Sequence, residues 1–70
     1  MAPDPLALPR TSVPAARALE AAGIHDLRDL AARTEREVAA LHGMGPKALR
    51  TYRVALAGAG LGFRVVPPAR

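Results

Sequence analysis

The segment LHGMGPK at positions 41–47 is the most informative part of the sequence for the fold, because it ends one helix and begins another within a few residues. Gly43 and Gly45 permit a tight, left-handed backbone and keep side chains off the approach to the turn. Met44, between them, is expected to point into the core and anchor the turn. Pro46 suits the first position of a helix, where its missing amide proton matters least. The stretch therefore predicts a helical hairpin.

The helix that follows this turn is expected to form an anion site. Its unpaired N-terminal amides and the positive end of its dipole face outward at the turn. Lys47, in the first turn, adds a cation at the same point, and Arg50 can flank it. This combination suits one phosphate of a nucleic-acid backbone, bound without reading a base. The alternative is a turn that serves only as a scaffold or as part of a protein-docking surface.

Capping residues and glycines divide the preceding chain into helices. Ser12 can cap a first helix that ends at Gly23, and a short second helix is expected over residues 26–32. Thr34 and Glu37 have the spacing of a capping box and begin a third helix. The helix after the hairpin turn is expected to end where glycines recur, near residue 58.

We therefore predict an all-α fold, a compact bundle of four to five short helices that contains the hairpin and no sheet. The domain spans residues 12–63, between a mobile, proline-rich arm at 1–11 and a basic tail at 64–70. Apolar positions with helical spacing are expected to form the core, namely Ala15, Leu19, Ala22, Leu27, Leu30, Val38, Leu41, Leu49, Tyr52 and Leu56.

The composition leaves little room for catalysis. Hydrophobic residues make up 50% of the chain, and sixteen of its 70 residues are alanine. A small core of this kind offers no large cleft lined by polar groups, so we expect no enzymatic activity and no catalytic residue. The chain has no cysteine, and His25 and His42 have no obvious third partner for a metal ion. We therefore expect neither a metal nor another cofactor.

A membrane segment is not predicted either. No apolar run approaches the ~20 residues that span a bilayer, and the start of the chain, MAPDPLALPR, lacks the pattern of a signal peptide. We therefore expect a cytoplasmic protein without a membrane partner.

Charge is distributed unevenly along the chain. Residues 1–42 hold five arginines and six acids, whereas residues 43–70 hold five cations and no acid. A one-sided basic surface suggests a polyanionic partner. Tyr52 and Phe63 are the only aromatic residues, and Tyr52 falls on the core stripe, so a stacking platform for single strands is missing. This pattern favours duplex DNA.

The hairpin stretch resembles the helix-hairpin-helix motif of DNA-binding proteins that do not read sequence. Over residues 13–63 the chain is also similar to the C-terminal domain of the bacterial RNA polymerase alpha subunit, in AGIH at 22–25, DL at 29–30, RTE at 33–35, GPK at 45–47 and LGF at 61–63. The resemblance implies a compact helical domain that binds DNA across the minor groove and contacts transcription factors. Because the chain has no assembly domain before this region, we expect a stand-alone relative.

Carried over by position, the resemblance implies hairpin contacts to DNA at Gly45, Lys47 and Ala48, and first-helix contacts at Pro14 and Arg17. The family has a groove-reading arginine at the position of Pro14, and proline cannot play that part. We therefore expect general backbone binding with weak sequence preference. The full set of candidate DNA-binding residues is Gly43, Gly45, Lys47, Ala48, Arg50 and Arg17.

Two classes of function stay open at this point. The first is a small, non-catalytic module that binds duplex DNA through backbone phosphates. The second is a protein–protein interaction module that docks on a transcription or DNA-processing complex with the same surface, and a transcription or repair protein is a candidate partner. Salt dependence separates them, because phosphate binding releases counterions and weakens steeply with salt.

Overall fold

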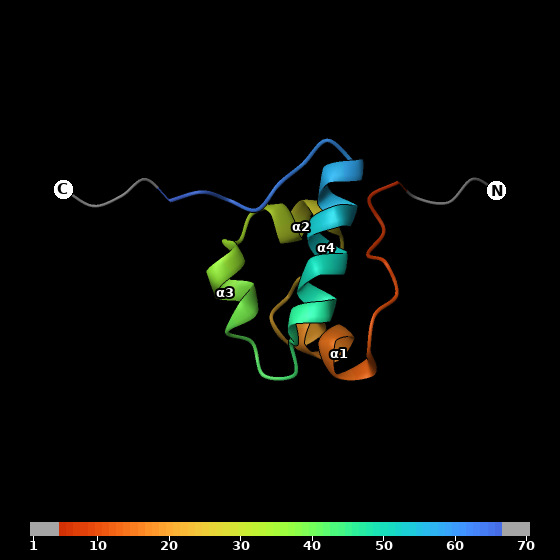
Figure 1. The fold of residues 1–70 in the computed structure, drawn as a ribbon, viewed down its shortest axis with the longest axis vertical. Coiled ribbons are helices and arrows are strands. Elements are labelled where there is room, and N and C mark those ends of the chain that lie inside the picture. The colour runs from red at the N-terminus through yellow and green to blue at the C-terminus, as the bar shows by residue number, and fades with distance from the viewer. Residues whose placement is uncertain (1–4, 67–70) are drawn as a thin grey trace.

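Four helices make up the part of the chain that the structure describes, residues 5–66 of a computed structural model (Figure 1). In chain order they are α1 (Val13–Ala21), α2 (Leu27–Ala31), α3 (Glu35–Ala39) and α4 (Pro46–Gly58). The longest helix, α4, lies at the centre and contacts both α2 and α3 (Figure 1). The predicted all-α bundle is confirmed, with four helices and no strand among these residues.

Side chains cap the first three helices, as their sequences predict. Ser12, Asp26 and Thr34 each accept a hydrogen bond from an amide in the first turn of α1, α2 and α3. The capping box is complete, because Glu37 N–H donates to Thr34 Oγ1 at 3.0 Å and Thr34 N–H donates to Glu37 Oε1 at 2.9 Å. Reciprocal bonds of this kind satisfy amides that the helix itself leaves unpaired.

Left-handed glycines close α1 and α4. Gly23 follows α1 with φ +78° and Gly60 follows α4 with φ +74°. After α1, the amide of Ile24 donates back to the carbonyl of Leu19 at 2.9 Å, which is the long bond of a Schellman motif. These local signals explain why the predicted ends of both helices agree closely with the observed ones.

The core sits where all four helices meet. Most of the predicted positions are buried, but Ala22, Leu41, Leu49 and Met44 are only partly buried against the core. Two buried residues, Ile24 and Ala48, were not among the predicted core positions. The buried set is Ala15, Leu19, Ile24, Leu27, Leu30, Val38, Ala48, Tyr52 and Leu56.

The segment before α1 packs against the domain, which differs from the mobile arm predicted over residues 1–11. Leu6 and Leu8 lie partly buried on the core, and the carbonyl of Leu6 accepts an amide of α2 at 2.7 Å. Thr11 and Tyr52 share a hydrogen bond between their hydroxyls. Prolines prevent a helix here but allow an extended chain to dock, and the buried tyrosine hydroxyl requires a partner. Residues 1–4 of the arm lie outside the described residues.

The tail predicted from residue 64 is joined to the domain at its start. The amide of Arg64 donates to the carbonyl of Arg33 at 2.9 Å, and the Arg64 guanidinium lies 3.7 Å from the carboxylate of Glu37. Residues 67–70 of the tail lie outside the described part of the chain. Between residues 5 and 66, no helix combines the length and apolar content that crossing a membrane requires.

Candidate functional site

The turn of the α3–α4 hairpin packs directly on the first turn of α1. Gly43 has φ +94°, and a Cβ atom there would lie 2.8 Å from the carbonyl oxygen of Pro14. A side chain at this position would therefore strain the backbone and collide with α1. Gly43 thus fixes the hairpin and the start of α1 as neighbours on one edge of the molecule.

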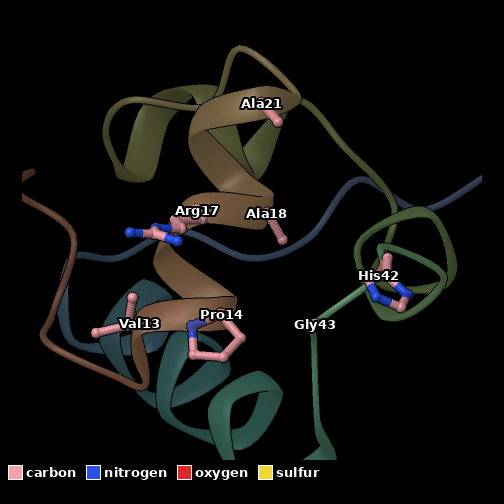
Figure 2. A pocket seen from close by; sticks show the side chains of 7 residues that line it. All are labelled: Val13, Pro14, Arg17, Ala18, Ala21, His42 and Gly43. Carbon is pink, nitrogen blue, oxygen red and sulfur yellow. The ribbon is translucent and has the colours of Figure 1, made fainter.

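Two hollows lie at this edge, and Gly43 and Pro14 line one of them. The first, the α4 hollow, has a volume of about 360 Å³ and is lined by Thr11, Ser12, Gly45, Pro46, Lys47, Ala48 and Thr51. The second, the α1 hollow, has a volume of about 460 Å³ and is lined by Val13, Pro14, Arg17, Ala18, Ala21, His42 and Gly43 (Figure 2). Neither set of lining residues contains an acid. Both hollows are therefore compatible with a negatively charged ligand.

Hydrogen-bond donors gather at the α4 hollow. The N-cap of α4 is Gly45, which has no side chain to cap the helix, and the first hydrogen bond of the helix runs from the Leu49 amide to the Gly45 carbonyl. The amides of Lys47 and Ala48 therefore donate to no acceptor within residues 5–66. Ser12 Oγ accepts from an amide of α1 at 3.3 Å, which leaves its hydroxyl proton available. An anion in this hollow would meet two amides, a hydroxyl and an ammonium group.

The two hairpin glycines have different roles, although the sequence suggests the same role for both. Gly45 has φ −94° and ψ 167°, an extended conformation that any residue adopts, and a Cβ atom added to it would have no atom within 4 Å. Only Gly43 has the left-handed backbone that favours glycine. At Gly45 the missing side chain instead leaves open space in front of the α4 amides.

The α1 hollow has a different chemical character. Its floor is formed mainly by carbon atoms of α1 and the hairpin, with Ala18 and Pro14 at the centre of Figure 2. His42 lies on the hairpin side of this floor, whereas the Arg17 guanidinium is directed away from His42 (Figure 2). The α1 hollow is therefore mainly apolar and has fewer polar groups directed into it than the α4 hollow has donors.

Several cations of the domain have partners inside it. Arg53 donates to both carboxylate oxygens of Glu35, at 3.1 and 2.6 Å, and Arg64 pairs with α3 as described above. Arg33 donates to the carbonyl of Ala22 at 3.0 Å. The acid-free second half of the chain is thus partly neutralised by the acids of α3. Among residues 5–66, the cations with no such partner are Arg10, Arg17, Arg28, Arg36, Lys47 and Arg50.

The predicted site residues divide between the two hollows. Gly45, Lys47 and Ala48 line the α4 hollow, whereas Gly43 and Arg17 line the α1 hollow. The side chain of Ala48 is only 8% exposed and belongs to the core, so the amide of this residue, rather than its methyl group, is its available group. Arg50 is exposed on α4 but lines neither hollow.

Sequence reasoning missed the hydroxyl residues of the α4 hollow. The sequence predicts Ser12 only as a helix cap, because nothing local indicates that the start of α1 lies beside the start of α4. Thr51 stands four residues after Lys47, a spacing that places both on one face of a helix. That spacing could have identified Thr51, whose hydroxyl donates to the Lys47 carbonyl at 3.1 Å.

No three His, Asp or Glu side chains within the described residues lie together as a metal site would require. A scan against models of known protein families found no match for this chain, and a search of curated proteins also found none. The function must therefore be inferred from the geometry and charge of the two hollows.

Proposed function

We propose that this chain is a small, non-catalytic module that binds duplex DNA through the phosphates of its backbone. The α4 hollow would hold one phosphate, with the Lys47 and Ala48 amides, the Ser12 hydroxyl and the Lys47 ammonium group as donors. The observation that carries the proposal is this collection of donors without an internal acceptor, at an edge without a lining acid. Backbone contacts of this kind position a protein on DNA without reading bases.

The packing of the hairpin on α1 supports a binding surface formed by both elements. A Cβ atom at Gly43 would lie 2.8 Å from the Pro14 carbonyl oxygen, so the hairpin turn and the start of the first helix are neighbours at one edge. Pro14 stands where the resembling family has a groove-reading arginine, and a proline side chain donates no hydrogen bond. The chain would therefore bind on the minor-groove side with weak sequence preference. It would not read a specific promoter element.

The proposal implies weak binding by a single domain. One phosphate site and a few exposed cations give an expected dissociation constant on the order of 10⁻⁴–10⁻⁶ M at physiological salt. Tighter binding would require tethered or adjacent copies. A cytoplasmic location belongs to the same proposal.

The test compares two substitutions with the same charge change, Lys47→Glu and Arg36→Glu. Arg36 is exposed on α3 and lines neither hollow. Lys47→Glu should weaken duplex binding far more than Arg36→Glu and should lower the salt dependence, as the slope of log K against log salt, by about 1. Fluorescence anisotropy with labelled duplex at two salt concentrations measures both quantities. Circular dichroism should show unchanged helix content, because an acid in the first turn of a helix is favourable.

Equal losses from the two substitutions, with both variants folded, would contradict a discrete phosphate site. That result would favour the second candidate, a module that docks on a transcription or repair protein. Exposed apolar side chains favour this candidate, since Val13 is 63% and Val54 is 66% exposed. Docking through such side chains would depend weakly on salt, unlike phosphate binding.

A further inference from the structure

Tyr52 is a buried residue of α4 whose polar group the proposed phosphate site does not use. Its side chain is 1% exposed, yet its hydroxyl reaches the hydroxyl of Thr11. Thr11 belongs to the segment before α1 and lines the α4 hollow together with Lys47 and Thr51. A hydrogen bond thus joins the core to the wall of the candidate phosphate site. Neither Tyr52 nor Thr11 is among the DNA contacts that the resemblance implies.

The direction of this hydrogen bond follows from the needs of the two hydroxyls. A buried hydroxyl proton requires an acceptor, and among residues 5–66 the Tyr52 hydroxyl has one hydrogen-bond partner, Thr11 Oγ1. Tyr52 therefore donates and Thr11 accepts. A threonine hydroxyl that accepts one hydrogen bond still has its own proton to donate. That proton is available at the wall of the α4 hollow, because Thr11 lines it.

The segment that carries Thr11 is fixed on both sides of this residue. Before it, Leu8 is partly buried on the core, and the carbonyl of Leu6 accepts the Leu27 amide at 2.7 Å. After it, Ser12 is the N-cap of α1. The Thr11 hydroxyl is thus held in place before a ligand arrives, and a donor that is already ordered loses little conformational freedom on binding.

We propose that Tyr52 is a positioning residue of the phosphate site, which directs the hydroxyl proton of Thr11 at a phosphate in the α4 hollow. This inference rests on the proposed function and deepens it. With the phosphate bound, the hydrogen bonds run in one direction, from Tyr52 to Thr11 and from Thr11 to a phosphate oxygen, and each polarises the next. Thr11 adds a neutral donor to the amides of Lys47 and Ala48 and the hydroxyl of Ser12.

The main test is a double variant, Tyr52→Phe with Thr11→Val, which removes both hydroxyls at once. Replacing both partners of a hydrogen bond by apolar groups of similar shape is nearly neutral for stability, so the double variant should melt close to the unchanged protein. Its affinity for a labelled duplex, measured by anisotropy, should fall about two- to tenfold, as expected for one lost hydrogen bond. Unchanged affinity in the folded double variant would overturn the proposal, because the pair would then serve stability alone.

The single variants test whether Tyr52 acts through Thr11. Thr11→Val should bind DNA as weakly as the double variant, although it is less stable because it leaves the Tyr52 hydroxyl without a partner. Tyr52→Phe should lose less affinity, since the Thr11 hydroxyl remains but rotates freely. Thr11→Ser keeps the hydroxyl and should bind like the unchanged protein. Weaker binding by the double variant than by Thr11→Val, or an equal loss in Thr11→Ser and Thr11→Val, would overturn the proposal.

Thr34→Ala is the matched control for lost stability. It removes a hydrogen bond at the start of α3, and Thr34 lines neither hollow. We expect a lower melting temperature with unchanged duplex affinity. A loss of affinity equal to that of the double variant would mean that any weakened hydrogen bond lowers binding, which would overturn the specific role of Tyr52.

Salt dependence separates this contact from that of the Lys47 ammonium group. A neutral donor releases no counterion, so the double variant should keep the salt slope of the unchanged protein, whereas Lys47→Glu lowers it by about 1. If Lys47→Glu weakens binding far more than Arg36→Glu while the double variant binds like the unchanged protein, only the role of Tyr52 is wrong. If Lys47→Glu binds as well as Arg36→Glu, the phosphate site itself is wrong.

Discussion

The N-termini of α3 and α4 differ in whether the protein itself satisfies their first amides. Each helix begins with amides that have no partner within the helix. At α3, Thr34 and Glu37 satisfy these amides with their own side chains. At α4, Gly45 provides no side chain, and the amides stay exposed to the α4 hollow.

The charged side chains at the N-termini of α3 and α4 differ in the same way. The acids of α3 have arginine partners from distant parts of the chain, Glu35 with Arg53 and Glu37 with Arg64. Lys47 at α4 has no acid partner among residues 5–66. At α3 the protein itself therefore supplies partners for the first amides and for the acids. At α4 the first amides and the Lys47 ammonium group have no such partner. A helix start of the second kind is where an external anion is stabilised most.

The largest expected effect comes from giving α4 the kind of cap that the other helices have. Gly45 has an extended conformation and open space in front of it, so Gly45→Asp should fold without strain and cap the α4 amides. Aspartate is preferred over glycine as a cap by a few tenths of a kcal/mol, so thermal stability should be equal or slightly higher. Duplex affinity should fall about tenfold or more, because the carboxylate occupies the place of the phosphate.

Gly62→Asp is the matched control for this change. Gly62 also has open space around the position of an added Cβ, and it lines neither hollow. The substitution alters net charge by the same amount, so it should weaken binding only slightly. Thermal melts and anisotropy on both variants separate the two outcomes. Equal weakening by both would show that the open end of α4 has no special role.

The fold was predictable because its signals are local. Ser12, Asp26 and Thr34 cap helices within three residues of themselves, and Gly23 closes α1 through bonds to the preceding turn. Periodicity then identified most of the core. The exception before α1 depends on distant partners, since Leu6 docks through α2 and Thr11 through Tyr52. No short stretch of sequence contains that information.

For the candidate site, the sequence predicted only which edge of the molecule it occupies. The pattern of Gly43, Gly45 and Lys47 indicated a hairpin beside a helix N-terminus, and those residues do lie there. The division into two hollows was not predictable, because it depends on where Pro14 packs. The pairing of Arg53 with Glu35 was also out of reach, since eighteen positions separate them and the contact exists only after α3 and α4 pack.

A smaller effect is expected from removing the side-chain cap at the N-terminus of α3. Thr34→Ala removes the cap of α3 and should cost about 1 kcal/mol of unfolding free energy. Duplex affinity should not change, because Thr34 lines neither hollow. Urea denaturation and anisotropy measure the two quantities. A loss of DNA binding in a folded Thr34→Ala variant would contradict a site confined to the start of α4.

The smallest expected effect is on how stability depends on pH through Glu37 at the capped N-terminus of α3. Hydrogen bonds from the Thr34 amide and then from its hydroxyl lower the pKa of the Glu37 carboxyl below its usual value, and Arg64 and Arg33 add to this. A carboxyl whose pKa is lowered by folding stabilises the protein above its unfolded pKa, about 4.3, and loses that contribution as the pH falls through the folded value. Other acids titrate in the same range, so the informative quantity is a difference between variants.

Glu37→Gln isolates this contribution. Glutamine keeps an oxygen that accepts the Thr34 amide in a capping box, but it does not titrate. Carboxyl groups titrate between roughly pH 6 and pH 3. Over this range the melting temperature of the unchanged protein should fall more than that of Glu37→Gln. Equal falls would mean that the Thr34–Glu37 bonds do not persist in solution. A difference would show that ionised carboxylate completes the start of α3, the same chemical role that a DNA phosphate is proposed to take at the start of α4.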